Sequence, residues 1–105
     1  MNFKDYQDKA WSFTVPSAQN GRYVSTGLIA EVGEYYGHEA KYIRDGGDVI
    51  DIENKLKKEL GDILWFIAAK ATLNGWNLQE IAEGNINKLQ ARRDFGTIQG
   101  NGDDR

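Results

Sequence analysis

Apolar residues recur at intervals of three and four through most of the chain, and this spacing constrains the fold more than any other feature. It places apolar side chains on one face of an α-helix, whereas a half-buried strand needs an interval of two. The one proline, Pro16, comes early, and Gly46, Gly47 and Gly75 stand where helices can end. We therefore predict four helices, at about residues 3–13, 23–44, 52–73 and 78–93.

Short connections between long helices predict an all-α fold, an antiparallel helical bundle of about four helices. Asp51 is the expected N-cap of the third helix. Three glycines inside the second helix, at positions 27, 33 and 37, indicate a close approach by another element. We assign residues 1–93 to the helical domain and residues 94–105 to a polar, glycine-rich tail. Deleting residues 97–105 is expected to lower activity more than stability.

Composition excludes several classes of protein. Among 105 residues, 13 Lys and Arg against 16 Asp and Glu give a net charge of −3, without the basic excess of a protein that coats nucleic acid. No apolar run approaches the roughly 18 residues that span a bilayer, and the first residues lack the apolar core of a signal peptide. The lack of cysteine excludes disulfide scaffolds and thiolate chemistry. We expect a cytoplasmic protein without a membrane or nucleic-acid partner.

Two pairs of acidic residues carry the chemistry. Glu31 and Glu34, like Glu59 and Asp62, are three residues apart, so each pair projects from one helix face. With the two helices antiparallel, the four carboxylates would converge. On a helical wheel Glu59 and Asp62 border the apolar arc near Phe66, where a carboxylate is costly unless it is paired or binds a cation. Such hard oxygen ligands match Mg²⁺ or Mn²⁺, and Mg²⁺ held in this way usually binds phosphates.

Two other interpretations of these acids stay open. They can be solvated helix residues paired with Lys55, Lys57 or Lys58. A di-iron bundle is disfavoured, because it needs Glu-x-x-His on two helices and the one histidine, His38, comes four residues after Glu34. His38 itself is expected to be a partly exposed helix residue that makes a hydrogen bond.

A basic stripe is predicted on the last helix, where Asn85, Lys88 and Arg92 fall within about 60° of the helical wheel. These side chains can grip phosphates and a sugar or base edge, or they can form a solvated helix end favoured by the dipole. Lys41 is equally open, because it can neutralise a phosphate or pair with Glu34.

Three aromatic residues are also candidates. Trp65 is expected in the core, whereas Trp11 and Phe66 either belong to the core or stack on a base.

The segments GLIAEVGE and KELGDILWF resemble the E-x-x-E … E-x-x-D motif of the MazG-like all-α nucleoside triphosphate pyrophosphohydrolases. NINKLQARR resembles the downstream Asn-x-x-Lys-Leu…Arg segment of that family. The opening YQDKAWSFTVP and the tail GTIQGNGDDR are similar to a short single-domain branch. The resemblance covers nearly the whole chain, and Ala30 stands where the branch more often has glycine.

The resemblance implies hydrolysis of nucleoside triphosphates to a monophosphate and pyrophosphate, in housekeeping of the nucleotide pool. It implies that the four acids hold Mg²⁺, as metal-binding and catalytic residues, and that Asn85, Lys88 and Arg92 contact the nucleotide. It also implies a homodimer or a dimer of dimers, with sites completed by neighbouring subunits. The alternative is a non-catalytic helical module that binds a nucleotide or a partner protein.

Overall fold

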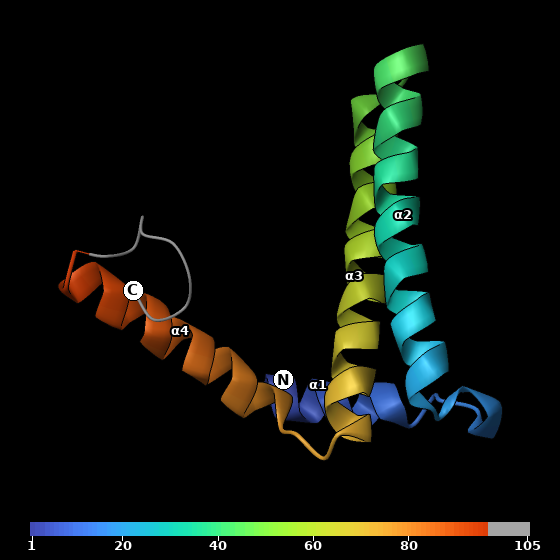
Figure 1. Ribbon diagram of the computed structural model, residues 1–105. Coiled ribbons are helices and arrows are strands. Elements are labelled where there is room, and N and C mark those ends of the chain that lie inside the picture. The colour runs from blue at the N-terminus through green and yellow to red at the C-terminus, as the bar shows by residue number, and fades with distance from the viewer. Residues whose placement is uncertain (97–105) are drawn as a thin grey trace.

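The computed structural model describes residues 1–96, and it confirms an all-α fold with four helices. Short polar or glycine-containing segments separate the helices, and a 3₁₀ turn lies between the first two (Figure 1). The elements are α1 (Phe3–Trp11), η1 (Pro16–Ala18), α2 (Gly21–Asp45), α3 (Val49–Leu73) and α4 (Leu78–Asp94). No helix within these residues is long and apolar enough to cross a membrane. The predicted role of residues 97–105 lies outside the described part of the chain.

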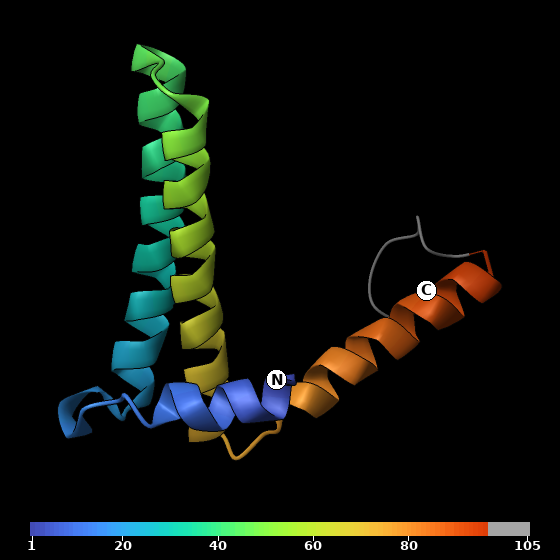
Figure 2. The ribbon, with the colours of Figure 1, turned by 180° about the vertical axis from the view of Figure 1, so that it is seen from behind.

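Helices α2 and α3 form a long antiparallel hairpin, and α1 crosses its base (Figures 1 and 2). Helix α4 packs against α1 and then extends away from the hairpin. The four helices are thus packed together through α1, but α4 does not close a compact bundle with α2 and α3. The radius of gyration, 16.9 Å, exceeds the roughly 13 Å of a compact chain of this length.

The hairpin turn fixes where α3 begins. Gly46 and Gly47 have φ angles of 71° and 122°, which favour glycine, and they reverse the chain directly after α2. Asp48 then caps α3, accepting hydrogen bonds from the backbone N–H groups of Ile50 at 2.7 Å and Asp51 at 3.2 Å. The prediction that Asp51 is the cap was wrong, because the tight turn lets the helix start one turn earlier.

A small core joins the base of the hairpin to α1. Its buried members are Val24, Phe66 and Ala69, with four partly buried neighbours: Trp11, Leu28, Trp65 and Leu73. A Cβ at Gly27 would overlap the Phe66 ring, so the predicted close approach is confirmed at this glycine. Nothing in the described chain lies within 4 Å of such an atom at position 33 or 37.

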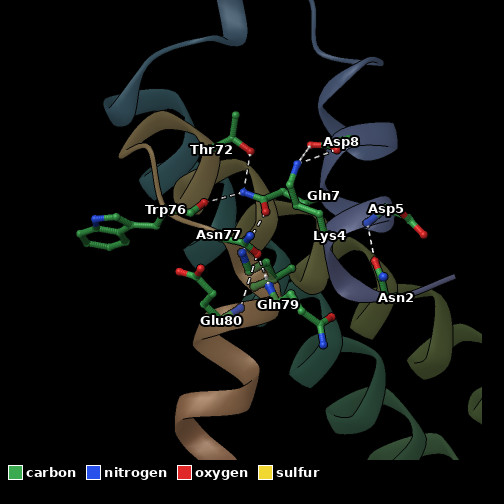
Figure 3. A network of polar contacts seen from close by, with 11 residues as sticks. Asn2, Lys4, Asp5, Gln7, Asp8, Thr72, Trp76, Asn77, Gln79 and Glu80 are labelled. Atoms are coloured by element: carbon green, nitrogen blue, oxygen red, sulfur yellow. Dashed lines mark hydrogen bonds and ion pairs between the residues drawn. The ribbon is translucent and has the colours of Figure 1, made fainter.

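Gln7 ties α1 to the connection between α3 and α4 (Figure 3). Its side chain is buried, and its Nε2 donates to Thr72 Oγ1 at 3.1 Å and to the Trp76 carbonyl at 2.8 Å. Its Oε1 accepts a hydrogen bond at 2.9 Å from the backbone N–H of Leu78, the first residue of α4. One amide therefore sets the position at which α4 leaves the base of the hairpin.

Candidate metal and nucleotide site

Three of the four predicted acids meet between α2 and α3. Glu31, Glu34 and Glu59 each offer a carboxylate oxygen, and these oxygens all lie within 4.8 Å of one another. The spacing of three residues puts the first two on one face of α2, and the antiparallel hairpin brings Glu59 opposite them. We call these three residues the acid cluster.

Asp62 lies at the edge of the acid cluster and is exposed. Its charge contributes to the raised pKa of Glu31, so it is near enough to act on the cluster electrostatically. Burial first and then the charge of Asp62 also raise the pKa of Tyr6 on α1. The fourth acid is therefore adjacent to the other three rather than among them.

The electrostatics of the acid cluster favour one retained proton. Burial, a hydrogen bond with Glu59 and repulsion from Glu34 and Asp62 raise the pKa of Glu31 to about 7. The same hydrogen bond lowers the pKa of Glu59, because a protonated Glu31 donates to its carboxylate. Like charges placed this close cannot all ionise without a cation.

His38 provides a further contact to the acid cluster. Its Nε2 lies 3.2 Å from Glu59 Oε1, and its side chain is 32% exposed against 13% for that of Glu59. The prediction of a partly exposed, hydrogen-bonded histidine is confirmed. The imidazole orients Glu59 from the side of the cluster nearer the hairpin turn.

The acid cluster fits a hard divalent cation. Oε2 of Glu31 and Oε2 of Glu59 are buried and have no hydrogen-bond partner in the described chain. A buried acceptor without a donor costs about 1–3 kcal/mol, and more when it is charged. A cation between these oxygens would satisfy them, and an all-oxygen donor set matches Mg²⁺ better than zinc or copper.

The basic stripe of α4 does not join the acid cluster within one chain. Asn85 is exposed, Lys88 is half-buried and Arg92 is 5% exposed. Because α4 packs on α1 and extends away from the hairpin (Figure 1), the helix that carries these residues lies on a separate part of the molecule. Sequence periodicity predicted the stripe but could not predict the direction of its helix.

The aromatic candidates lie in or against the core. Trp65 is half-buried, packs on the core and donates its Nε1–H to the Ala10 carbonyl at 3.1 Å, as a core residue does. Trp11 is half-buried against the same core. Phe66 is buried, but the edge of its ring still lines a surface cavity beside Glu31.

Two residues that were not among the predicted site residues line cavities next to the acid cluster. Tyr23 lies two turns before Glu31 on α2, and Lys55 lies one turn before Glu59 on α3. Intervals of eight and four residues keep each on the same helix face as its acid, which was a signal available in the sequence. Lys41 lines the same cavity as Lys55.

The chain matches a known domain family and is similar to a phage protein. Residues 19–95 match the model of the MazG nucleotide pyrophosphohydrolase domain, in agreement with the resemblance drawn from the sequence. The chain is also similar to the gene 37 protein of Mycobacterium phage L5, with 45% identity over 86 residues, covering 79% of this chain and 75% of that protein. No solved structure matches the chain significantly.

Proposed function

Because the chain belongs to the MazG nucleotide pyrophosphohydrolase family, we propose that it hydrolyses nucleoside triphosphates between the α- and β-phosphates in the presence of Mg²⁺. Water adds across that anhydride bond, so one nucleoside monophosphate and one pyrophosphate leave with the released proton. The observation that carries the proposal is the acid cluster, three carboxylates from two helices within 4.8 Å. Removal of unwanted nucleotides from the pool is the physiological role that we infer.

In this proposal Glu31, Glu34 and Glu59 hold Mg²⁺, and Asp62 completes the set from its edge. Mn²⁺ is expected to substitute, because it takes the same oxygen ligands. The cation would polarise phosphate oxygens and lower the pKa of bound water. His38 keeps the Glu59 carboxylate oriented, and any carboxylate not used as a ligand is placed to hold or accept the water proton.

The basic residues would neutralise the negative charge of the phosphates. Lys41 lies on the cluster side of the hairpin, where an ammonium group can stabilise charge on the phosphates. Asn85, Lys88 and Arg92 belong to α4, which extends away from the hairpin of its own chain. We therefore assign Asn85 and Lys88 to the site of a second copy, in a homodimer or homotetramer, whereas Arg92 is 5% exposed in its own chain.

Exposed apolar residues support self-association. On α2, Ile29 and Tyr36 are 73% and 59% exposed, and at about 100° per residue they lie roughly opposite Glu34. On α3, Leu60 and Ile67 are 53% and 41% exposed. Leu60 and Ile67 lie about 20° apart on the α3 helical wheel, and we call these two residues the apolar face of the hairpin.

The test is pyrophosphate release from a panel of deoxynucleoside and ribonucleoside triphosphates, with and without Mg²⁺. We expect turnover of at least one nucleotide, and a loss of at least about 100-fold in Glu59→Gln, because both charge and a ligand are removed. Glu53→Gln is the matched control, since Glu53 is an exposed acid on the same helix outside the cluster. Equal rates in wild type and Glu59→Gln would exclude the proposed site.

A nucleotide-binding or protein-interaction module without turnover predicts a different result. Replacing both Glu34 and Asp62 by Ala would then leave the Mg²⁺ dependence of the melting temperature unchanged. For the enzyme, we expect Mg²⁺ to raise the melting temperature of wild type and to have little effect on that double variant.

A further inference from the structure

His38 is a histidine that contacts the acid cluster without belonging to it. It lies four residues after Glu34 on α2, so it projects from nearly the same face of that helix. Its Nε2 lies 3.2 Å from Oε1 of Glu59, which comes from α3. The imidazole is partly exposed, whereas the Glu59 side chain is mostly buried. The contact therefore joins the edge of the acid cluster to one of its innermost oxygens.

The imidazole is the donor in this contact. The pKa of Glu59 is lowered, first by its hydrogen bond with Glu31 and further by the one with His38. Glu59 is therefore ionised at neutral pH, and an ionised carboxylate can only accept hydrogen bonds. Nε2 of His38 carries a proton for this reason, so this nitrogen has no free lone pair with which to bind a metal.

The two oxygens of the Glu59 carboxylate have different surroundings. Oε1 accepts the hydrogen bond from His38, whereas Oε2 is buried and has no hydrogen-bond partner in the described chain. Oε2 of Glu31 is also buried and without a partner among these residues. A cation in the acid cluster would thus find one Glu59 oxygen unengaged and the other already held by an N–H group.

The number of oxygens that Glu59 can offer affects the choice of cation. Ca²⁺ takes roughly six to eight oxygen ligands at about 2.3–2.6 Å, and it often binds both oxygens of one carboxylate. Mg²⁺ requires a tight octahedron at about 2.0–2.1 Å, keeps several waters and needs few carboxylates. An N–H group that occupies Oε1 of Glu59 therefore takes a ligand from Ca²⁺ and leaves the octahedron of Mg²⁺ intact.

We propose that His38 is a positioning residue that restricts Glu59 to one ligand oxygen, and that the acid cluster thereby prefers Mg²⁺ or Mn²⁺ to Ca²⁺. This inference rests on the proposed function and adds to it the way in which the site selects its cation. His38 acts through Glu59 and does not touch the cation itself. Its hydrogen bond fixes both the orientation of the carboxylate and the number of oxygens that remain for the metal.

The test measures the affinity of the full chain for cations alone. The electron paramagnetic resonance signal of free Mn²⁺ reports its binding, and Mg²⁺ or Ca²⁺ is then added to displace it. In His38→Ala we expect Mg²⁺ binding to weaken about 10-fold, because Glu59 loses its orienting partner. Ca²⁺ binding should not weaken, because a second oxygen of Glu59 becomes available. The ratio of the two affinities should therefore shift about 10-fold toward Ca²⁺.

Two further variants separate the hydrogen bond from a general effect on the fold. His38→Gln keeps an N–H donor at a similar reach and should hold the ratio within about threefold of wild type. Asn54→Ala is the matched control, because Asn54 is an exposed neutral residue of α3 and lines neither cavity next to the acid cluster. It should change neither affinity. Since neither position belongs to the core cluster, helix content without metal should match wild type in all three variants.

The outcomes separate this inference from the proposed function. Equal weakening of Mg²⁺ and Ca²⁺ in His38→Ala, no change in either, or the same shift in His38→Gln as in His38→Ala overturns the role of His38. In each of these cases, Mg²⁺-dependent pyrophosphate release by wild type keeps the enzyme. A wild type that binds no Mn²⁺ and releases no pyrophosphate overturns both. A shift toward Ca²⁺ in His38→Ala that His38→Gln reverses supports the inference.

Discussion

In the crowded acid cluster, the Glu31 carboxyl keeps a proton that an isolated glutamate would lose. With its pKa raised to about 7, it is about half protonated at neutral pH, whereas in the unfolded chain it would ionise near pH 4.5. The folded protein therefore holds a proton between these two pH values that the unfolded chain has lost. Stability from this residue is present at low pH and is lost as the pH rises through about 7.

A pH series of melting temperatures tests this residue. Without Mg²⁺, we expect the wild-type melting temperature to fall by a few °C from pH 5.5 to 8, and Glu31→Gln to remove most of that slope. The stabilisation by Mg²⁺ should grow over the same range, because the cation competes with the proton. A slope that is identical in wild type and Glu31→Gln would contradict the raised pKa.

Gly27 is the residue at which the hairpin depends on the lack of a side chain. A methyl group there would overlap the Phe66 ring, so we expect Gly27→Ala to lower the free energy of unfolding by about 2–3 kcal/mol. Gly61→Ala is the control, because nothing lies within 4 Å of the added atom and Ala favours the helix by up to about 1 kcal/mol. Urea denaturation measures both. Equal stabilisation by the two substitutions would show that the ring moves freely aside.

At the scale of the element, Gln7 controls how α4 is attached. Gln7→Ala removes three hydrogen bonds and leaves the Leu78 N–H without its acceptor. We expect a loss of about 2–4 kcal/mol in the free energy of unfolding, and faster amide exchange at the start of α4 than in α2 or α3. Gln90→Ala removes two exposed side-chain contacts within α4, with Arg93 and Asp94, and should cost less than about 0.5 kcal/mol.

The helices themselves were predictable from the sequence, because apolar spacing and glycine positions act locally. All four were found within a few residues, and the convergence of Glu31, Glu34 and Glu59 followed from their spacing and an antiparallel hairpin. The start of α3 was misplaced because two aspartates, at positions 48 and 51, both suit an N-cap. Only the φ angles of the glycine pair decide between them.

The direction of α4 was not predictable in the same way. Its apolar residues show which side of the helix should be buried. They do not show whether the residues that pack against that side come from the same chain or from another. A hydrogen-bond network around one buried amide, far from α4 in the sequence, fixes where the helix starts. Long-range contacts of this kind leave no periodic pattern. The basic stripe therefore stays a prediction, and the sequence could not place its helix relative to the acid cluster.

At the scale of the whole molecule, one chain exposes more surface than a compact protein of its size. Its accessible surface is 7612 Å², against about 5,900 Å² expected for a compact monomer of this mass. The difference is about 1,700 Å² and is comparable with the surface that stable protein interfaces bury in total. The apolar face of the hairpin is the part of the surface best suited to that burial.

Leu60→Glu tests the assembly. A charge on the apolar face should convert the proposed oligomer to monomers in sedimentation velocity at micromolar concentration. If α4 completes the site of a second copy, activity should fall at least about 10-fold while helix content is retained. Lys57→Glu, an exposed change on the same helix, should keep both the oligomer and the activity. An active Leu60→Glu monomer would contradict the assembly and the role of α4 across subunits.

The extended shape of the single chain has a consequence for how the proposed activity would depend on the abundance of the protein. If much of its apolar surface is buried only by a second copy, dilution removes stability and catalytic residues together. The rate per chain would then drop once the protein becomes scarce. Total activity would therefore rise more steeply than the concentration of the protein. A cell or phage that makes little of this protein would have almost none of its activity, without any dedicated inhibitor.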